Sequence, residues 1–301
     1  MGLMKSGRVN IVITNHVLRY SYHKNNTVAG MTVHGEVELP EGTIKDGNIE
    51  NDGVFVEIVN QLVHVHKWKR KRLFFAMPDD TVVIRQLQIP AALAMEETVG
   101  YIKTQIGNSL YLPFPDPVIA IESIDADDKY RDILLFAYPE DKIKGFKAAF
   151  ETAGLRPMAA DLTSLSIYRY YYQTKPKDRN HVLLIHWNKD AIVLTAFRNH
   201  KAIFTRYMKI TVDKETDEEQ VQQLINQYMI EINRIIDFYH YSITKGEGKV
   251  EQLLLTGDSP FLGMVKSSLS SLIPLPIDGL EQEELPAKYM DVLGLALKND
   301  S

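Results

Sequence analysis

The chain has 301 residues, of which 45% are hydrophobic and 24% charged, the composition of an ordinary globular protein. This length is about twice that of a typical domain, so it predicts two domains or one domain with a large insertion. A net charge of -5 argues against a dedicated nucleic-acid binder, which would need a basic surface to neutralise phosphates. Because the chain has no cysteine, disulfides and thiolate metal sites are excluded.

The start of the chain, MGLMKSGRVNIVITNH, lacks an apolar stretch as long as that of a signal peptide. No run approaches the roughly 18 to 20 apolar residues that are needed to cross a bilayer. We therefore expect a cytosolic protein that does not insert into a membrane but could dock on a membrane protein.

The first half of the chain predicts an antiparallel meander, followed by helices and further strands. Residues 9–39 hold three stretches rich in β-branched and aromatic residues, separated by polar breaks, as in three consecutive strands. The spacing of Val54, Ile58, Leu62 and Val65 predicts an amphipathic helix that begins after a cap at Asn51–Asp52. Further elements are expected as strands over 71–78 and 81–90, a helix over 95–107, a hairpin over 118–139, and helices over 140–153 and 161–172, the last capped by Asp161.

The second half repeats this order. The polar, proline-containing segment 175–180 is the best linker candidate, and we place the domain boundary there. The elements expected after it are strands over 181–187, 191–199 and 201–210, a helical region over 213–242, a strand over 250–257, a helix over 260–271, a short strand over 273–277 and a closing helix over 289–298. The shared order predicts two related α/β domains, residues 1–175 and 176–301, that face each other across a cleft.

Proteins of this shape usually hold a nucleotide in the cleft and grip its phosphates with the tight turn between the first two strands of each domain. Such turns need glycine, which leaves room for phosphate beside backbone N–H groups, and a carboxylate nearby to organise Mg²⁺ through water. Here the turns IVITNHVLRY and LLIHWNKDAIVL contain no glycine and no aspartate before the turn. Asn15 and Asn188 are expected to supply left-handed turn geometry around a crowded phosphate pocket. Gly257, directly after a strand, marks a place for close approach to a nucleotide or an ordinary strand-to-helix turn.

The histidines of the chain have simpler interpretations than catalysis or metal binding. His186 could be a general base, but its turn holds no Ser or Cys nucleophile and its near carboxylate is Asp190, so packing at a strand end beside Trp187 is the simpler interpretation. His64 and His66 lie two residues apart on a predicted helix and point in different directions, which disfavours a shared metal ion.

Residues 67–72, KWKRKR, form the strongest basic run of the chain. This run could bind anionic lipid or nucleic acid, with Trp68 as an interfacial anchor. The alternative is the solvated end of the preceding helix, where the helix dipole favours cations.

Five colinear segments cover nearly the whole chain: QLQIPAALAMEETVGYIKTQIGNSLYLPFPDPVIAIESI, FKAAFETAGLRPMAADLTSLSIYRYY, MIEINRIIDFYHYS, VEQLLLTGDSPFLGMVKSSL and YMDVLGLALK. Together they resemble the PilM family of type IV pilus assembly proteins. The resemblance implies an actin-like (ribonuclease H-like) two-domain α/β fold related to the cell-division protein FtsA, with an α+β subdomain inserted in the first domain over about residues 82–158. It also implies ATP binding between the domains, and a groove beside the extra subdomain that holds the short cytoplasmic N-terminal tail of the membrane protein PilN.

This chain departs from the family pattern at its phosphate loops. Where the family has an Asp-Ile-Gly type first loop followed by small hydroxyl residues, residues 12–16 read Val-Ile-Thr-Asn-His, and where the second loop repeats Asp-Ile-Gly, residues 186–188 read His-Trp-Asn. The third loop keeps Thr256 and Gly257, but Asp258 replaces the next glycine and would repel phosphate. The resemblance therefore implies fold and partner more than ATP use.

We expect a degenerate actin-like scaffold, peripheral at the inner face of the plasma membrane, that grips the tail of a PilN-like single-pass membrane protein together with other pilus assembly components. The alternative is an active switch of the same fold that binds ATP and Mg²⁺, with Lys189 and backbone amides in place of the lost glycines. The candidate residues of the degenerate cleft are Asn15, His16, Asn188, Lys189, Glu231, Arg234 and Gly257. The candidate groove wall is Ile89, Tyr111, Leu112 and Phe114, although YLPFP could simply turn the chain.

Overall fold

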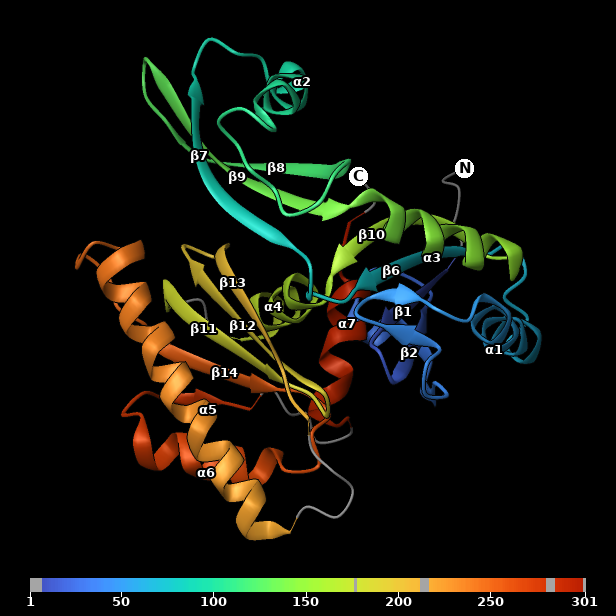
Figure 1. Ribbon diagram of the computed structural model, residues 1–301. Coiled ribbons are helices and arrows are strands. Elements are labelled where there is room, and N and C mark those ends of the chain that lie inside the picture. Colours follow the sequence, from blue (N-terminus) through green and yellow to red (C-terminus); the bar gives the residue numbers. More distant parts are fainter. Residues whose placement is uncertain (1–6, 176–177, 212–216, 280–284, 300–301) are drawn as a thin grey trace.

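Two five-stranded mixed sheets form the two halves of the molecule (Figure 1). The structure is a computed structural model, and it describes residues 7–175, 178–211, 217–279 and 285–299. The strand orders are β10-β6-β1-β2-β3 and β13-β12-β11-β14-β15. The first sheet consists of β1 (Arg8–Ile13), β2 (Val17–His23), β3 (Met31–Glu38), β6 (Arg72–Met77) and β10 (Arg156–Leu162). The second consists of β11 (His181–Trp187), β12 (Ala191–Arg198), β13 (Lys201–Lys209), β14 (Gln252–Thr256) and β15 (Ile277–Asp278).

The two sheets have the same topology. In each half, three strands form an antiparallel meander, and two later strands extend the sheet in parallel from the other side of the first strand. The predicted repetition of a meander followed by further strands is therefore confirmed. Strand β1 is buried along its whole length because helices cover both faces of the sheet, and four of its six residues are apolar.

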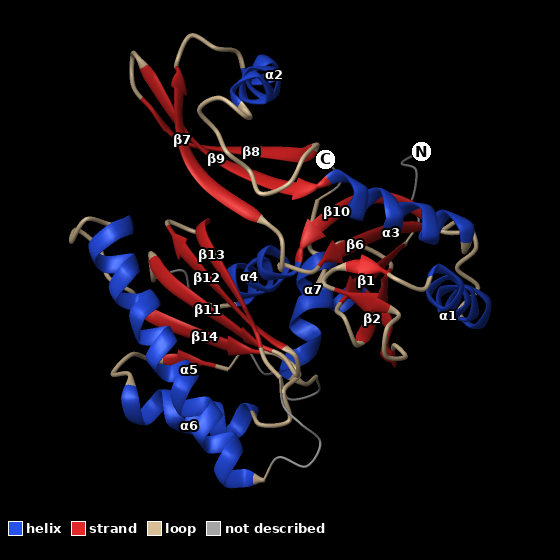
Figure 2. Cartoon of the chain, in the orientation of Figure 1, coloured by secondary structure: helices blue, strands red, loops and turns tan. Residues whose placement is uncertain are grey.

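Helices from both halves cross between the two sheets (Figure 2). On the outer faces lie α1 (Asp52–Val65) and α3 (Glu140–Thr152) of the first half, and α5 (Glu218–Phe238) and α6 (Leu262–Leu272) of the second. Between the sheets lie α4 (Thr163–Thr174) and α7 (Met290–Ala296). A Cβ at Gly294 of α7 would lie 1.7 Å from the Ser166 carbonyl oxygen of α4, so only glycine permits this close crossing.

The inserted subdomain interrupts the first half between β6 and β10. Its sheet has the order β7-β9-β8, from β7 (Val83–Pro90), β8 (Pro117–Ala126) and β9 (Tyr130–Pro139), and α2 (Met95–Gln105) covers it. The predicted insertion ran to about residue 158, but α3 packs on the first domain, since Phe146 and Phe150 make edge-to-face contacts with Phe55 of α1. The closing helix α7, from the second half, likewise packs on the first sheet through Val292 and Leu295.

Most predicted elements are confirmed, and two details were wrong. Strand β10 was not predicted, because it is an edge strand with a register shift beside Pro157 and few β-branched residues. Asp161 does not cap α4 but lies within β10 and pairs with Arg169 at 2.8 Å. Instead, Asp79 Oδ2 accepts the backbone N–H of Ser164 at 2.8 Å in the first turn of α4.

Short elements complete the chain: the β4 (Ile44–Lys45) and β5 (Asn48–Ile49) hairpin, 3-10 turns over Val28–Gly30 and Ala287–Tyr289, and a π-helical turn over Tyr239–Ile243 after α5. Of the predicted linker, residues 176–177 lie outside the described residues. Among the helices of the described ranges, none combines the length and apolarity needed to cross a bilayer.

Candidate functional site

The predicted turns of the two meanders meet in the cleft between the sheets. Each is a tight hairpin turn, closed by hydrogen bonds from Thr14 N to Val17 O at 3.0 Å and from Asn188 N to Ala191 O at 2.8 Å. Neither Asn15 nor Asn188 has a positive φ angle, so the expectation of left-handed geometry at these two residues was wrong. Their side chains instead make hydrogen bonds across the cleft and between loops.

His16, in the first turn, joins the two domains through two carboxylates of the second. Its Nε2 lies 2.9 Å from Asp258 Oδ2, and its Nδ1 lies 3.4 Å from Asp190 Oδ1. Burial lowers the pKa of His16, but hydrogen bonds to Asp190 and Asp258 and their negative charges outweigh burial and raise it to about 9. The imidazolium form therefore prevails at neutral pH, and both ring nitrogens donate. Asn15 Nδ2, from the same turn as His16, also donates to Asp190, at 3.1 Å from Oδ2.

Arg19 of β2 is a second cation of the first domain that contacts Asp258, and its side chain is fully buried. Its guanidinium donates from Nη2 to Asp258, from Nη1 to Asp291 Oδ2 at 2.7 Å, and from Nε to Glu36 Oε2 at 3.4 Å. Burial raises the pKa of Asp258, but the His16 hydrogen bond and the charge of Arg19 bring it well below the usual range. Asp258 is therefore a buried anion held by two cations of the first domain.

Asp258 also joins the loop of Asn188 and Lys189 to its own loop after β14 by two hydrogen bonds. Lys189 N donates to Asp258 Oδ1 at 3.0 Å, and Asp258 N donates to Asn188 Oδ1 at 3.2 Å. Gly257 has a φ of 138°, and a Cβ on it would lie 1.9 Å from the Trp187 carbonyl oxygen. Gly257 is therefore needed for close contact between two loops of the protein. The Lys189 N–H lies in a turn of the kind that cradles phosphate, but here it donates to the Asp258 side chain.

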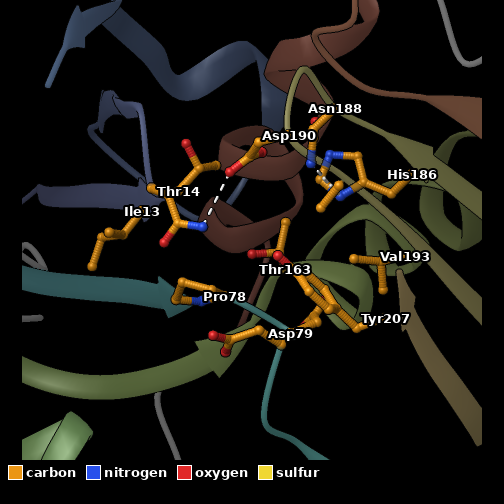
Figure 3. Close-up of a pocket in the computed structure, with 13 residues that line it drawn as sticks. Ile13, Thr14, Pro78, Asp79, Thr163, His186, Asn188, Asp190, Val193 and Tyr207 are labelled. Carbon is orange, nitrogen blue, oxygen red and sulfur yellow. Dashed lines mark hydrogen bonds between the residues drawn. The ribbon is translucent and has the colours of Figure 1, made fainter. Parts of the chain in front are cut away.

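The cavity that remains in the cleft has a volume of about 30 Å³ (Figure 3). Its lining includes Thr14, Asp79, Thr163, Asp190 and Tyr207. This volume suits about one water molecule, whereas pockets for small organic ligands have roughly 300–1,000 Å³.

Burial favours the uncharged form of two titratable groups at this cavity. Burial raises the pKa of Asp79 to about 7. Burial, together with the charge of Arg19, lowers the pKa of His186 to about 4. His186 is thus a neutral, buried residue of the strand end at physiological pH, which agrees with the packing interpretation rather than with a general base.

Other ion pairs across the cleft are exposed and contribute less. They join Lys209 to Asp46 at 3.2 Å, and Lys189 to Glu38 at 3.9 Å. Exposed pairs of this kind typically contribute about 0–1 kcal/mol. The buried cluster of His16, Arg19 and Asp258 therefore dominates the contact between the domains at this site.

Of the predicted cleft residues, Asn15, His16, Asn188, Lys189 and Gly257 are brought together. Glu231 and Arg234 are not part of this cluster: they pair with each other on α5, and among the described residues neither has a hydrogen bond or ion pair to the three loops. No group of three or more His, Asp or Glu residues in the described part of the chain is placed to hold a metal ion.

A larger cavity of about 310 Å³ lies between the inserted subdomain and the first domain. It is lined mainly by apolar side chains of β8, β9, β10, α3 and α4, among them Val118, Ala120, Phe136, Ile143, Ala160, Leu162 and Leu165. Strands β8 and β10 are edge strands of their sheets, so each has an unpaired row of backbone N–H and C=O groups. We call this cavity the subdomain groove.

None of the four predicted groove-wall residues lines the subdomain groove. Ile89 is only 1% exposed and packs in the subdomain core with Ile102 and Leu135, so it is not available to a partner. Leu112 packs partly against the same core, and Tyr111 is exposed away from this lining. For Leu112 of YLPFP, the structure therefore agrees with the alternative interpretation, in which these residues pack in the subdomain.

The paired sheets of identical topology, the interdomain cleft and the inserted subdomain define a protein of the actin-like fold. The family model described as type IV pilus assembly protein PilM matches residues 16–220, more than half of the chain, and the chain therefore belongs to this family. No curated protein sequence matches it.

Three solved structures are similar over nearly the whole chain. A PilM–PilN type IV pilus biogenesis complex has a TM-score of 0.78 at 15% identity, covering 96% of this chain and 97% of that chain. The ethanolamine utilization protein EutJ of Carboxydothermus hydrogenoformans has a TM-score of 0.58 at 10% identity, covering 98% and 90%. A Bacteroides thetaiotaomicron protein with an actin-like ATPase fold has a TM-score of 0.55 at 12% identity, covering 98% and 97%.

Proposed function

We propose that this protein is a cytoplasmic scaffold of a type IV pilus or related assembly machine, and that it binds the cytoplasmic N-terminal tail of a PilN-like single-pass membrane protein. Family membership and the likeness to a PilM–PilN complex support the class of partner. The observation that carries the proposal for this chain is the subdomain groove. Through its partner the protein is peripheral at the inner face of the plasma membrane.

The groove suits an extended peptide better than a compact ligand. Edge strand β8 offers free backbone groups for main-chain pairing, and Val118 and Ala120, on the exposed face of β8, line the groove. The apolar lining continues on the opposite wall through Ala160 and Leu162 of β10. Alternate apolar side chains of a bound tail would then enter the groove, while its backbone extends the subdomain sheet.

Replacing Ala120 with tryptophan is expected to weaken binding of the tail at least about 10-fold, because the larger ring fills the groove, a loss of about 1.4 kcal/mol or more. The measurement is fluorescence anisotropy with a labelled peptide of the N-terminal tail of the PilN-like protein from the same organism. Ala126→Trp, at an exposed position further along β8 and outside the groove lining, is the matched control and should bind like wild type. Equal affinities of the two variants would contradict a tail site in this groove.

We further propose that the cleft closes without nucleotide. The residues present do not fit the phosphates of ATP, because the Lys189 N–H donates to Asp258 and the cavity has about 30 Å³. Asp258 itself is an anion bound by His16 and Arg19, as a phosphate group would be. The carboxylate thus acts as an internal substitute for a bound anion, and this supports a scaffold over an ATP-driven switch.

Addition of about 5 mM ATP with Mg²⁺ is therefore expected to leave the melting temperature unchanged, measured by differential scanning fluorimetry. A ligand present at about 100 times its Kd would stabilise the folded protein by about 2.7 kcal/mol and raise the melting temperature measurably. Such a rise, lost in a Lys189→Ala variant, would instead establish the alternative of an ATP-binding switch.

A further inference from the structure

Six basic residues gather at the amino-terminal edge of the first sheet. They lie in the loop after α1 and at the starts of β6 and β10, and we call them the basic platform: Lys67, Lys69, Arg70, Lys71, Arg72 and Arg156. In the sheet register Arg72 stands beside Arg156 on one side and Arg8 on the other. The chain as a whole has a net charge of -5, opposite in sign to this surface.

The basic platform is rigid rather than a frayed helix end. Helix α1 ends at Val65, and the loop after it is fixed to its neighbours by hydrogen bonds from Arg70 N to Gly154 O at 2.7 Å and from Arg156 N to Lys71 O at 2.9 Å. Lys67 and Arg70 have φ angles of 58° and 62°, in the left-handed region that costs a non-glycine residue about 1–2 kcal/mol. The surrounding contacts outweigh this cost, so the cations are presented in a fixed arrangement.

Trp68 supports the loop from inside. It is only 3% exposed, stacks on His66 with ring centroids 4.5 Å apart, and packs against Tyr20 and Tyr22. The prediction of Trp68 as an interfacial anchor was therefore wrong. Its burial also weighs against single-stranded nucleic acid as the partner of this surface, because such binding depends on exposed aromatic rings on which bases stack.

We propose that the basic platform docks on the anionic lipid surface of a membrane. A negatively charged leaflet attracts each Lys or Arg near its surface by about 1 kcal/mol, and no sequence-specific groove or pocket is needed. Exposed Val65, 69% accessible at the end of α1, adds an apolar contact beside the cations. The contact is peripheral, through charge, and needs no inserted segment.

The position of the basic platform also suits the tail-binding scaffold, and this step rests on the proposed function. Ile143, near the start of α3, lines the subdomain groove, whereas Gly154, just past its end, contacts the platform loop. The 13 residues of α3 span about 20 Å. With the platform on the lipid surface, a tail would need about six extended residues to reach the groove from the membrane.

The test is flotation of the purified protein with vesicles, without any partner, so that it is independent of the tail site. Wild type is expected to float with vesicles of phosphatidylcholine containing about 30% phosphatidylglycerol at about 0.1 M salt, and not with phosphatidylcholine alone. Combined Lys67→Glu, Lys69→Glu and Arg70→Glu changes are expected to weaken this partition at least about 100-fold. A matched control, Lys103→Glu with Lys129→Glu and Lys266→Glu, changes the net charge equally at exposed sites elsewhere and should float like wild type.

Equal loss of flotation in both triple variants would show that vesicle binding depends only on net charge, and this would overturn the proposal. Wild-type protein that does not float with the anionic vesicles would also overturn it. Tighter binding to a DNA duplex than to vesicles at equal phosphate concentration would assign the surface to nucleic acid instead. Tail-peptide binding, measured on the same variants, should be unchanged. Loss of vesicle binding with peptide binding intact separates this inference from the proposed function.

Discussion

Replacing Arg19 with methionine is expected to lower the free energy of unfolding by about 3–5 kcal/mol at pH 7, measured by urea unfolding. Arg19 is fully buried and supplies hydrogen bonds to Asp258, Asp291 and Glu36. Asp291 is 1% exposed, so it has no water to replace the lost cation. The cost therefore arises less from the pair that is lost than from the buried carboxylates left behind.

A second change distinguishes this cause from loss of packing. In the double variant Arg19→Met with Asp291→Asn, the stranded negative charge is removed as well, and we expect a substantial part of the stability to return, because neutral replacement of a whole buried pair is often tolerated. Arg19→Lys should be intermediate, since one ammonium cannot match the planar fork that reaches three carboxylates. A single Arg19→Met variant as stable as wild type would mean that the cluster does not hold the domains together.

The local pattern of the chain was sufficient for most of the elements but not for this cluster. The meanders follow from alternating β-branched residues and polar breaks, and their repetition indicated two similar sheets. Arg19 and its partners Asp258 and Asp291 lie 239 and 272 positions apart, so no sequence window contains both ends. One signal was present: Asp291 is a lone carboxylate in an otherwise apolar closing helix, and such a group requires a buried partner. The sequence alone did not identify Arg19 as the cation that pairs with Asp291.

The prediction of Ile89 as a groove-wall residue was wrong for a related reason. Ile89 and Leu112 are apolar residues next to prolines and turns, a composition that suits either a partner surface or a small core. In a subdomain of three strands and one helix, nearly every large apolar residue is needed for the core, and Ile89 is used there with Ile133. The groove itself forms between two units, from β8 and β10, and β10 was not recognised as a strand. A surface shared by two units is specified by their arrangement rather than by a local pattern.

The stability that His16 provides is expected to disappear as the pH rises. The pKa of His16 is about 9 in the folded protein and 6.5 for an ordinary histidine, so the folded state binds the proton more tightly. The contribution is therefore complete below about pH 6.5 and is lost as the pH rises through 9. At 1.36 kcal/mol per pKa unit the change amounts to about 3 kcal/mol. We expect the difference in unfolding free energy between wild type and His16→Gln to shrink by this amount over that interval.

His186 provides the matched control, because it is a buried histidine in the same cleft with the opposite shift. Its pKa of about 4 lies below 6.5, so it stays neutral on folding and lowers stability only as the pH falls from 6.5 towards 4. The difference between wild type and His186→Gln should then be constant from pH 6.5 to 9, whatever its size. If His16→Gln also gave a constant difference over this interval, His16 would not carry a charge shared with Asp190 and Asp258. A difference that shrinks for His16 alone would instead identify its imidazolium as a cation that stabilises the folded protein through Asp190 and Asp258.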